Sequence, residues 1–159
     1  GFTLVRSADP LDIVEINFPT MFVTVIHPQI EIKTSEARAI LPQQVPLKDA
    51  VRNWSNLGAL VAALAKGDYG LISRSMEDLI VEPARKSLIP KFDEVKQASL
   101  AAGALGGGIS GSGPSMFMLS ETLTIAGAVR VAMTKIYSDT HIEFNSYVSE
   151  ISPGGVQFV

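Results

Sequence analysis

Ala104-Leu-Gly-Gly-Gly-Ile-Ser-Gly-Ser-Gly-Pro-Ser-Met-Phe-Met-Leu119 is the stretch from which the rest of this chain can be interpreted. Five of its first ten residues are glycine. Glycine permits positive φ and close approach of a ligand to the backbone, and successive N–H groups in such a turn can bind an anion. The apolar run 115–119 is typical of a buried strand. The stretch therefore predicts a strand near residues 105–109, a loop, and a second strand.

The glycines alone leave the role of this loop open. It is either a phosphate-handling loop between two strands or a glycine-rich hairpin that only reverses the chain. No Lys-Ser or Lys-Thr pair follows, as a Walker phosphate loop requires. A strand rather than a helix is predicted to follow, unlike in a Rossmann fingerprint.

Composition limits the classes of protein to which the chain can belong. It has 159 residues, 47% of them hydrophobic, which is enough for one domain with a core. A net charge of −3 argues against nucleic acid or an anionic membrane as the main partner. The absence of cysteine excludes disulfides and thiolate metal sites and suits a cytoplasmic protein. No apolar run reaches the roughly 20 residues of a membrane-spanning helix.

Two strands and a short helix are predicted on the N-terminal side. Residues 11–17 and 21–26 are the strands, and the second is rich in β-branched and aromatic residues. The first has no evident partner strand. Residues 34–41 predict a short helix with Thr34 or Ser35 as its cap.

The longest predicted helix begins with Pro46 as a first-position proline. Gly67 follows it where a left-handed C-terminal cap belongs. Apolar residues recur along it at spacings of 4, 3, 4, 3 and 4, which places them on one helical face. These residues are Leu47, Val51, Trp54, Gly58, Val61 and Ala65. We expect this face to be part of the core.

The remaining predicted elements surround the glycine-rich stretch. They are helices over residues 69–79, 90–102 and 120–137, a single turn over 82–85, and strands over 142–148 and 156–159. Asp68 and Ser120 are the predicted caps of the first and last of these helices. From residue 21 onward, the order predicts an α+β fold of the split β-α-β-β-α-β (ferredoxin-like) type. Such a fold has an antiparallel sheet with helices on one face.

Two groups of residues besides the loop could carry chemistry. Thr34 and Arg38 lie four residues apart on one helical face, where a hydroxyl and a guanidinium can bind a carboxylate. Spacing alone nevertheless favours a capped surface helix with a solvated arginine. Arg85 is either an anion clamp held by a proline turn or, as its position alone favours, a salt-bridge partner of Glu82 or Glu77.

The candidates for acid–base or metal chemistry are weaker. Asp49, Asp78 and Glu82 are conceivable general bases, although a helix-surface charge is the commoner explanation for each. His27 and His141 lack the spacing of a metal site and are interpreted as strand-end residues. We therefore assign no catalytic residue and no metal ligand from the sequence.

Four stretches together resemble a known family. Gly106-Gly-Gly-Ile-Ser-Gly-Ser-Gly-Pro-Ser115 resembles the third conserved motif of the GHMP small-molecule kinases. Within that superfamily, three more resemble the homoserine kinases: His27-Pro-Gln-Ile-Glu-Ile-Lys-Thr-Ser-Glu-Ala-Arg-Ala-Ile-Leu-Pro42, Leu47-Lys-Asp-Ala-Val51, and Val81-Glu-Pro-Ala-Arg85 with Leu88-Ile-Pro90. The resemblance implies the fold of a GHMP kinase C-terminal domain. It also implies ATP-dependent phosphorylation of L-homoserine to O-phospho-L-homoserine, a step of threonine biosynthesis.

The resemblance further assigns substrate-binding roles to six residues. In the family, a threonine and an arginine bind the substrate and a second arginine lies at the substrate carboxylate. A Gly-Ser-Gly loop lies against the substrate and supports the phosphate region. The matching positions are Thr34, Arg38 and Arg85, and Gly111, Ser112 and Gly113.

One motif of the family does not occur. The nucleotide-binding run Pro-x-x-x-Gly-Leu-Gly-Ser-Ser belongs to the N-terminal half of these kinases, together with the residues that hold Mg²⁺. We therefore expect a C-terminal portion, in which residues 1–20 remain from an N-terminal domain and residues 21–159 are the GHMP kinase C-terminal domain. Phosphoryl transfer depends on positioning and on charge neutralisation by the metal. The portion alone is expected to be inactive and to bind neither ATP nor Mg²⁺, and a homodimer is compatible with it.

Two alternative functions remain open. A non-catalytic amino-acid-binding regulatory module shares the strand order and the glycine turns, but it does not need two distant arginines and Thr34. Another GHMP kinase, such as a mevalonate-type enzyme, is disfavoured by the run Thr34-Ser-Glu-Ala-Arg38.

Overall fold

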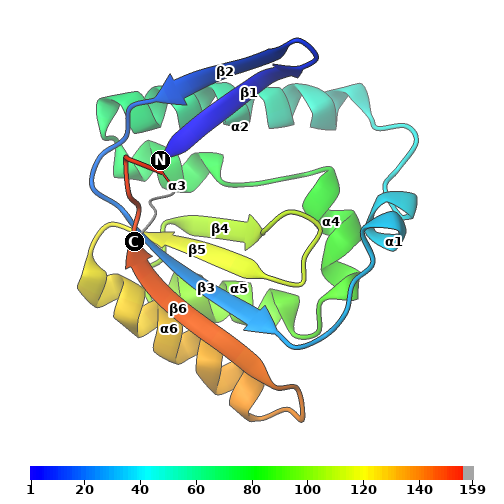
Figure 1. The fold of residues 1–159 in the computed structure, drawn as a ribbon, viewed down its shortest axis with the longest axis vertical. Coiled ribbons are helices and arrows are strands. Elements are labelled where there is room, and N and C mark those ends of the chain that lie inside the picture. Colours follow the sequence, from blue (N-terminus) through cyan, green and yellow to red (C-terminus); the bar gives the residue numbers. More distant parts are fainter. Residues whose placement is uncertain (156–159) are drawn as a thin grey trace.

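A computed structural model describes residues 1–155 of the chain (Figure 1). The elements in chain order are β1 (Phe2–Ala8), β2 (Leu11–Ile16), β3 (Phe22–Pro28), α1 (Thr34–Ala39), α2 (Leu47–Lys66), α3 (Tyr69–Ser75), α4 (Val81–Arg85), the 3₁₀ turn η1 (Lys86–Leu88), α5 (Phe92–Ala101), β4 (Gly106–Ile109), β5 (Met116–Ser120), α6 (Leu123–Ser138) and β6 (Phe144–Glu150). From β3 onward this is the order that the sequence predicts.

Four of the strands form one antiparallel sheet in the order β4-β5-β3-β6. The central strand β3 pairs with β5 on one side and β6 on the other, so that Val25 lies between Phe117 and Tyr147. Helices α5 and α6 cover one face of this sheet (Figure 1). The predicted split β-α-β-β-α-β fold is therefore confirmed.

The main core lies between the sheet and the helices α5 and α6. Ile26 of β3 and Met116 and Met118 of β5 point into it, because alternate residues of a strand face the same side. Val129 and Met133 of α6 meet them and are fully buried, as their helical spacing predicts.

A smaller apolar cluster joins α2 and α3 to the sheet. Its buried members are Met21, Ala63, Leu64, Ile72 and Leu119. Since Leu119 follows Met118 on β5 and points to the opposite side, this strand contributes to both clusters. The short helices α1 and α4 lie beyond the sheet, near the loop between β4 and β5 (Figure 1).

The apolar stripe of α2 is largely exposed, so its prediction as core is wrong. Leu47, Val51 and Trp54 face solvent, with 64% of the Trp54 surface accessible. The buried residues of this helix are Ala50, Ala63 and Leu64. Helical spacing identifies an apolar face, but it does not show which surface, if any, covers that face.

Residues 2–16 form a hairpin that is separate from the main sheet. β1 pairs with β2 in antiparallel register, from Phe2 opposite Ile16 to Ala8 opposite Leu11. The strand that was predicted to lack a partner therefore pairs with the segment just before it. Apolar side chains, among them Val5, Leu11 and Ile13, are exposed on this hairpin.

The N-terminal caps of α1 and α2 differ from the predicted ones. Lys33 is the N-cap of α1 and makes no side-chain capping bond, so neither Thr34 nor Ser35 caps the helix. Pro46 is the N-cap of α2 rather than its first residue. At the other end, Gly67 adopts the left-handed conformation, with φ of 68°, as predicted.

The last helix begins later than predicted, because β5 extends through Ser120. The hydroxyl of Thr122 caps α6 by accepting a hydrogen bond from the backbone N–H of Ile125. Leu123, in the first turn of this helix, is exposed. The predicted cap Asp68 of α3 is confirmed.

Other boundaries shift by a few residues. α3 ends at Ser75 rather than at 79. The chain then leaves the helix and leads to Asp78, whose hydrogen bonds to the start of α4 are described below. The strand predicted over 142–148 spans 144–150. The strand predicted over 156–159 lies outside the described residues.

Candidate functional site

The strand β4 can approach β5 and α4 closely only because it consists largely of glycine. A Cβ atom on Gly107 would lie 2.0 Å from the carbonyl oxygen of Phe117. A Cβ atom on Gly108 would lie 2.8 Å from a carboxylate oxygen of Glu82. A larger residue at position 107 would displace the backbone of one of the two strands, whereas one at position 108 would require only the flexible Glu82 side chain to shift.

The loop between β4 and β5 reverses direction through two glycines of positive φ. Gly111 has φ of 62° and Gly113 has φ of 86°, a region that favours glycine. The backbone N–H of Ser110 donates to the carbonyl of Ser115 at 2.8 Å and closes the loop. The imidazole Nδ1 of His27 lies 2.7 Å from the Ser115 hydroxyl and ties the end of the loop to β3.

Arg85 connects this loop to α1. Its Nε donates to the carbonyl oxygen of Ala37 at 3.0 Å, and its Nη1 donates to the carbonyl oxygen of Gly111 at 3.0 Å. The salt-bridge explanation of Arg85 is wrong, because Glu82 pairs with Lys96 and the other candidate carboxylate pairs with an arginine of α2. Within residues 1–155, the second terminal nitrogen of Arg85 makes no hydrogen bond.

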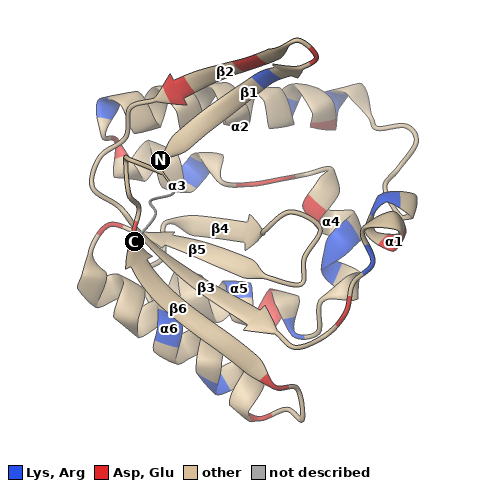
Figure 2. Cartoon of the chain, in the orientation of Figure 1, with Lys and Arg blue, Asp and Glu red and all other residues tan. Residues whose placement is uncertain are grey.

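Thr34 and Arg38 lie on α1, the helix whose Ala37 carbonyl oxygen accepts the hydrogen bond from Arg85. The hydroxyl of Thr34 is 3.5 Å from that of Ser112 in the loop. Arg38 is exposed in the last turn of α1 and makes no hydrogen bond or ion pair within the described range. Figure 2 shows basic positions on α1 and α4, beside the loop, and acidic positions on the same two helices. The structure thus brings the six predicted residues to one end of the molecule.

Asp78 organises the start of α4. Its carboxylate accepts hydrogen bonds from the backbone N–H groups of Ile80, Val81 and Glu82 and from the Asn53 side chain. Burial acts to raise the pKa of Asp78, but these hydrogen bonds outweigh it and hold the pKa below its ordinary value of 3.8. A carboxylate whose pKa is lowered and whose acceptors are occupied is a poor general base. The sequence suggested Asp78 only as a conceivable general base or a helix-surface charge, although an Asp shortly before a helix is also a capping signal.

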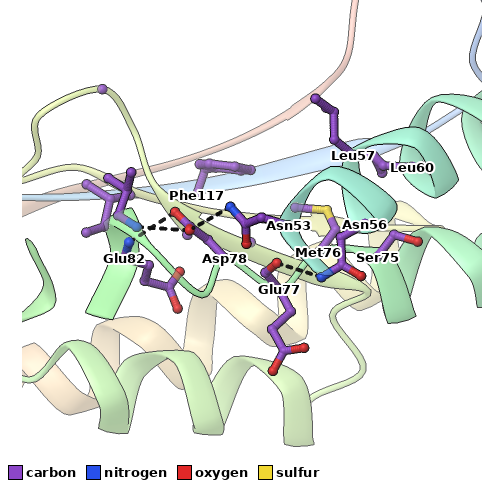
Figure 3. A pocket seen from close by; sticks show the side chains of 15 residues that line it. Asn53, Asn56, Leu57, Leu60, Ser75, Met76, Glu77, Asp78, Glu82 and Phe117 are labelled. Carbon is purple, nitrogen blue, oxygen red and sulfur yellow. Dashed lines mark hydrogen bonds between the residues drawn. The ribbon is translucent and has the colours of Figure 1, made fainter. Parts of the chain in front are cut away.

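A pocket of about 280 Å³ lies between α2, β4 and the segment around Asp78 (Figure 3). Its apolar lining includes Leu57, Leu60, Met76, Ile109 and Phe117. Its amides are already bonded to protein, since the Asn56 side chain donates to the carbonyl of Glu77 at 2.9 Å. Gly111 also lines this pocket, which therefore borders the glycine loop.

The described residues offer no ready metal site. Among residues 1–155, no group of three or more His, Asp or Glu side chains could hold a metal ion. None of the helices in this range is long and apolar enough to cross a membrane.

Comparison with known proteins identifies the class. The family described as GHMP kinases C terminal matches residues 60–139, a range that contains α3 to α6 and the glycine loop. This chain belongs to that family.

More particularly, the chain is similar to proteins named homoserine kinase. That of Chlorobaculum tepidum is 45% identical over 162 residues, which cover 100% of this chain and 50% of the relative. That of Chloroherpeton thalassium is 50% identical over 138 residues, which cover 86% of this chain and 43% of the relative. The chain therefore spans about half the length of the curated relatives it matches.

Solved structures agree with this relationship. The crystal structure of homoserine kinase from Cytophaga hutchinsonii superposes with a TM-score of 0.91 at 53% identity, covering 94% of this chain and 48% of that one. Phosphomevalonate kinase of Streptococcus pneumoniae superposes with a TM-score of 0.67 at 15% identity and supports the fold alone.

Proposed function

We propose that this chain is the substrate-side half of an ATP-dependent homoserine kinase of threonine biosynthesis in the cytoplasm. The observation that carries the proposal is the pair of hydrogen bonds from Arg85 to α1 and to the glycine loop. Those bonds assemble the residues that match the family's substrate site. The close relatives named homoserine kinase support the choice of substrate.

In this proposal, Arg38 and Arg85 hold the carboxylate of L-homoserine, and Thr34 adds a neutral hydrogen bond. The hydroxyl oxygen of homoserine attacks the γ-phosphorus of ATP, the bond to the bridging oxygen of ADP breaks, and the hydroxyl proton is released. The substrate carboxylate must be kept away from the γ-phosphate, because the two anions repel each other. A planar guanidinium suits this task, since its donors form a fork that fits a carboxylate.

The loop residues Gly111, Ser112 and Gly113 lie against the substrate in this proposal and support the phosphate region. ATP and Mg²⁺ bind through the other half of the longer protein, where the relatives have as many residues again. Residues 1–20 belong with that half, and residues 21–159 are the substrate-side domain.

Lysine substitutions test the carboxylate clamp in the full-length enzyme. Arg38→Lys and Arg85→Lys keep the charge but lose the fork, so each should raise the KM for homoserine by about one to two decades. The KM for ATP should change by less than about twofold, because neither residue contacts the nucleotide. Arg130→Lys on α6 is the matched control, since Arg130 bonds only to Ser146 among the described residues. If the KM for homoserine is the same as that of the wild type in both Arg38→Lys and Arg85→Lys, the proposal is contradicted.

The activity of this chain alone tests the division of labour between the two halves. Without the nucleotide half, no homoserine-dependent ADP production is expected from the purified chain. The full-length enzyme should produce ADP only when homoserine is present. ADP production by the isolated chain would show that nucleotide binding does not need the other half.

A further inference from the structure

Asp78 lies outside the proposed substrate site, yet its carboxylate accepts four hydrogen bonds. We infer that Asp78 is a positioning residue that fixes α4, and through α4 the guanidinium of Arg85, against α1 and the glycine loop. The kinetic part of this inference rests on the proposed homoserine kinase activity. Its structural part depends only on hydrogen bonds within this chain.

The carboxylate of Asp78 uses both of its oxygens. Oδ1 accepts from the backbone N–H of Ile80 at 2.8 Å, from that of Val81 at 3.0 Å and from the Asn53 side chain at 3.3 Å. Oδ2 accepts from the backbone N–H of Glu82 at 3.0 Å. Figure 3 shows this carboxylate on one wall of the pocket, with dashed hydrogen bonds to Asn53 and to the start of α4.

Asn53 completes the connection to α2. Its amide nitrogen donates to Asp78, and its amide oxygen accepts from the backbone N–H of Leu79 at 2.9 Å. One side chain of the long helix therefore holds both the capping carboxylate and the backbone beside it. Because α2 has 20 residues and is anchored in the second apolar cluster, it is a rigid base for this contact.

The helix held in this way, α4, is too short to be stable by itself. α4 has only five residues and none of them is fully buried, so helix propagation and apolar packing contribute little to its direction. Besides the bonds to Asp78, it is held by the ion pair of Glu82 with Lys96 of α5. Its first turn is bonded to Asp78, and its last residue is Arg85. Loss of the bonds at the start would therefore free the end, where Arg85 meets the carbonyl oxygens of Ala37 and Gly111.

An amide cannot replace this carboxylate, although it has nearly the same shape. All four partners of Asp78 are donors, and an asparagine has one acceptor oxygen and an NH₂ group that also donates. At least one donor would then face another donor. Asp78→Asn is thus a selective test. Glu77→Gln is its matched control, since Glu77 is the adjacent carboxylate and forms an exposed ion pair with Arg52.

Hydrogen exchange at Arg85 gives a readout that is independent of activity. In this chain, the Nε–H of Arg85 should be protected by its bond to Ala37, and Asp78→Asn should accelerate its exchange about tenfold. Glu77→Gln should leave the rate within about twofold of wild type. If Asp78→Asn does not fold, Asn53→Ala removes one donor and the bond to Leu79, and a smaller acceleration is expected.

Kinetics in the full-length enzyme complete the test. Asp78→Asn should raise the KM for homoserine about tenfold and leave that for ATP within about twofold, which a general loss of stability would not do. A wild-type enzyme without homoserine-dependent activity would refute the proposed function, and the exchange at Arg85 would then decide the inference alone. If a folded Asp78→Asn or Asn53→Ala variant shows unchanged exchange at the Nε–H of Arg85, the inference about Asp78 is overturned. Homoserine-dependent activity of the wild-type enzyme would still uphold the proposed function in that case.

Discussion

At the scale of single residues, strand β4 requires glycine because only a hydrogen atom fits where other residues have a side chain. Gly107 lies against the backbone of β5, where no side chain fits. Gly111 and Gly113, in contrast, serve the shape of the turn through positive φ. The glycines of one short stretch therefore meet two different physical requirements, close packing and backbone conformation.

A matched pair of alanine substitutions tests the packing requirement. Gly107→Ala should destabilise the chain by about 3 kcal/mol or more, because its Cβ would lie 2.0 Å from a backbone oxygen that cannot move freely. Gly127→Ala, inside α6 with nothing within 4 Å of the new atom, should instead stabilise it by about 0.5–1 kcal/mol. Urea denaturation followed by circular dichroism measures both. Similar effects of the two substitutions would refute the close-packing account.

The low pKa of Asp78 predicts a pH dependence of stability. The unfolded carboxyl has a pKa near its ordinary 3.8, and the folded one lies below it. The ionised group therefore contributes its stability above the unfolded value and loses it as pH falls through the folded value. Asp78→Asn should cost about 1–2 kcal/mol near pH 7, and the difference from wild type should shrink in acid. A difference that is constant down to about pH 3 would contradict this assignment.

At the scale of elements, α2 combines well-defined ends with an unexpected orientation. Gly67 ends it in the left-handed conformation, and the helix runs for 20 residues. Yet Trp54, the only tryptophan of the chain, points to solvent while the small residue Ala63 is buried. The largest side chain of this helix therefore contributes little to the core.

Substitutions on the two faces of α2 should differ sharply in cost. Trp54→Ala should lower the free energy of unfolding by less than about 1 kcal/mol, because Trp54 is 64% exposed. Leu64→Ala, at a position that is 2% exposed, should lower it by about 2–5 kcal/mol. Thermal and urea unfolding of both variants provide the comparison. A loss at Trp54 as large as that at Leu64 would show that the stripe is buried after all.

At the scale of the whole molecule, the chain consists of a sheet with two apolar clusters and a hairpin beside it. β3 is paired on both sides, and β5 contributes side chains to both clusters. The hairpin β1–β2 pairs only with itself among the described strands and exposes Val5, Leu11 and Ile13. A two-stranded hairpin is marginally stable in water. Stability should therefore be unevenly distributed over the molecule.

Amide hydrogen exchange should reveal this distribution. In this chain, backbone amides of β1 and β2 should exchange about 100-fold faster than those of β3 and β5, because the hairpin opens without disturbing the main core. In the full-length enzyme the hairpin should become protected, since we propose that residues 1–20 belong with the other half. Equal protection of hairpin and central sheet in this chain alone would contradict the first expectation. An unprotected hairpin in the full-length enzyme would contradict the second.

The sequence by itself determined most of the elements, the order of strands in the fold, and the class of protein. Those features depend on short-range signals: Gly67 as a helix end, Asp68 as a cap, the β-branched and aromatic residues of β3, and the glycine motif before β5. Each acts within a few residues, where backbone conformation and local hydrogen bonding dominate.

Only the tertiary structure decided which surfaces meet. Spacing placed Trp54 on an apolar face of α2, but burial depends on what lies opposite that face, and among the described residues most of the Trp54 surface stays exposed. Spacing also gave Arg85 two nearby carboxylates, whereas the fold gives it two carbonyl oxygens from α1 and the loop. The Asp78 cluster likewise needs Asn53, which is 25 residues away along the chain. Such partners are chosen by long-range packing, and local sequence signals do not encode the positions that result.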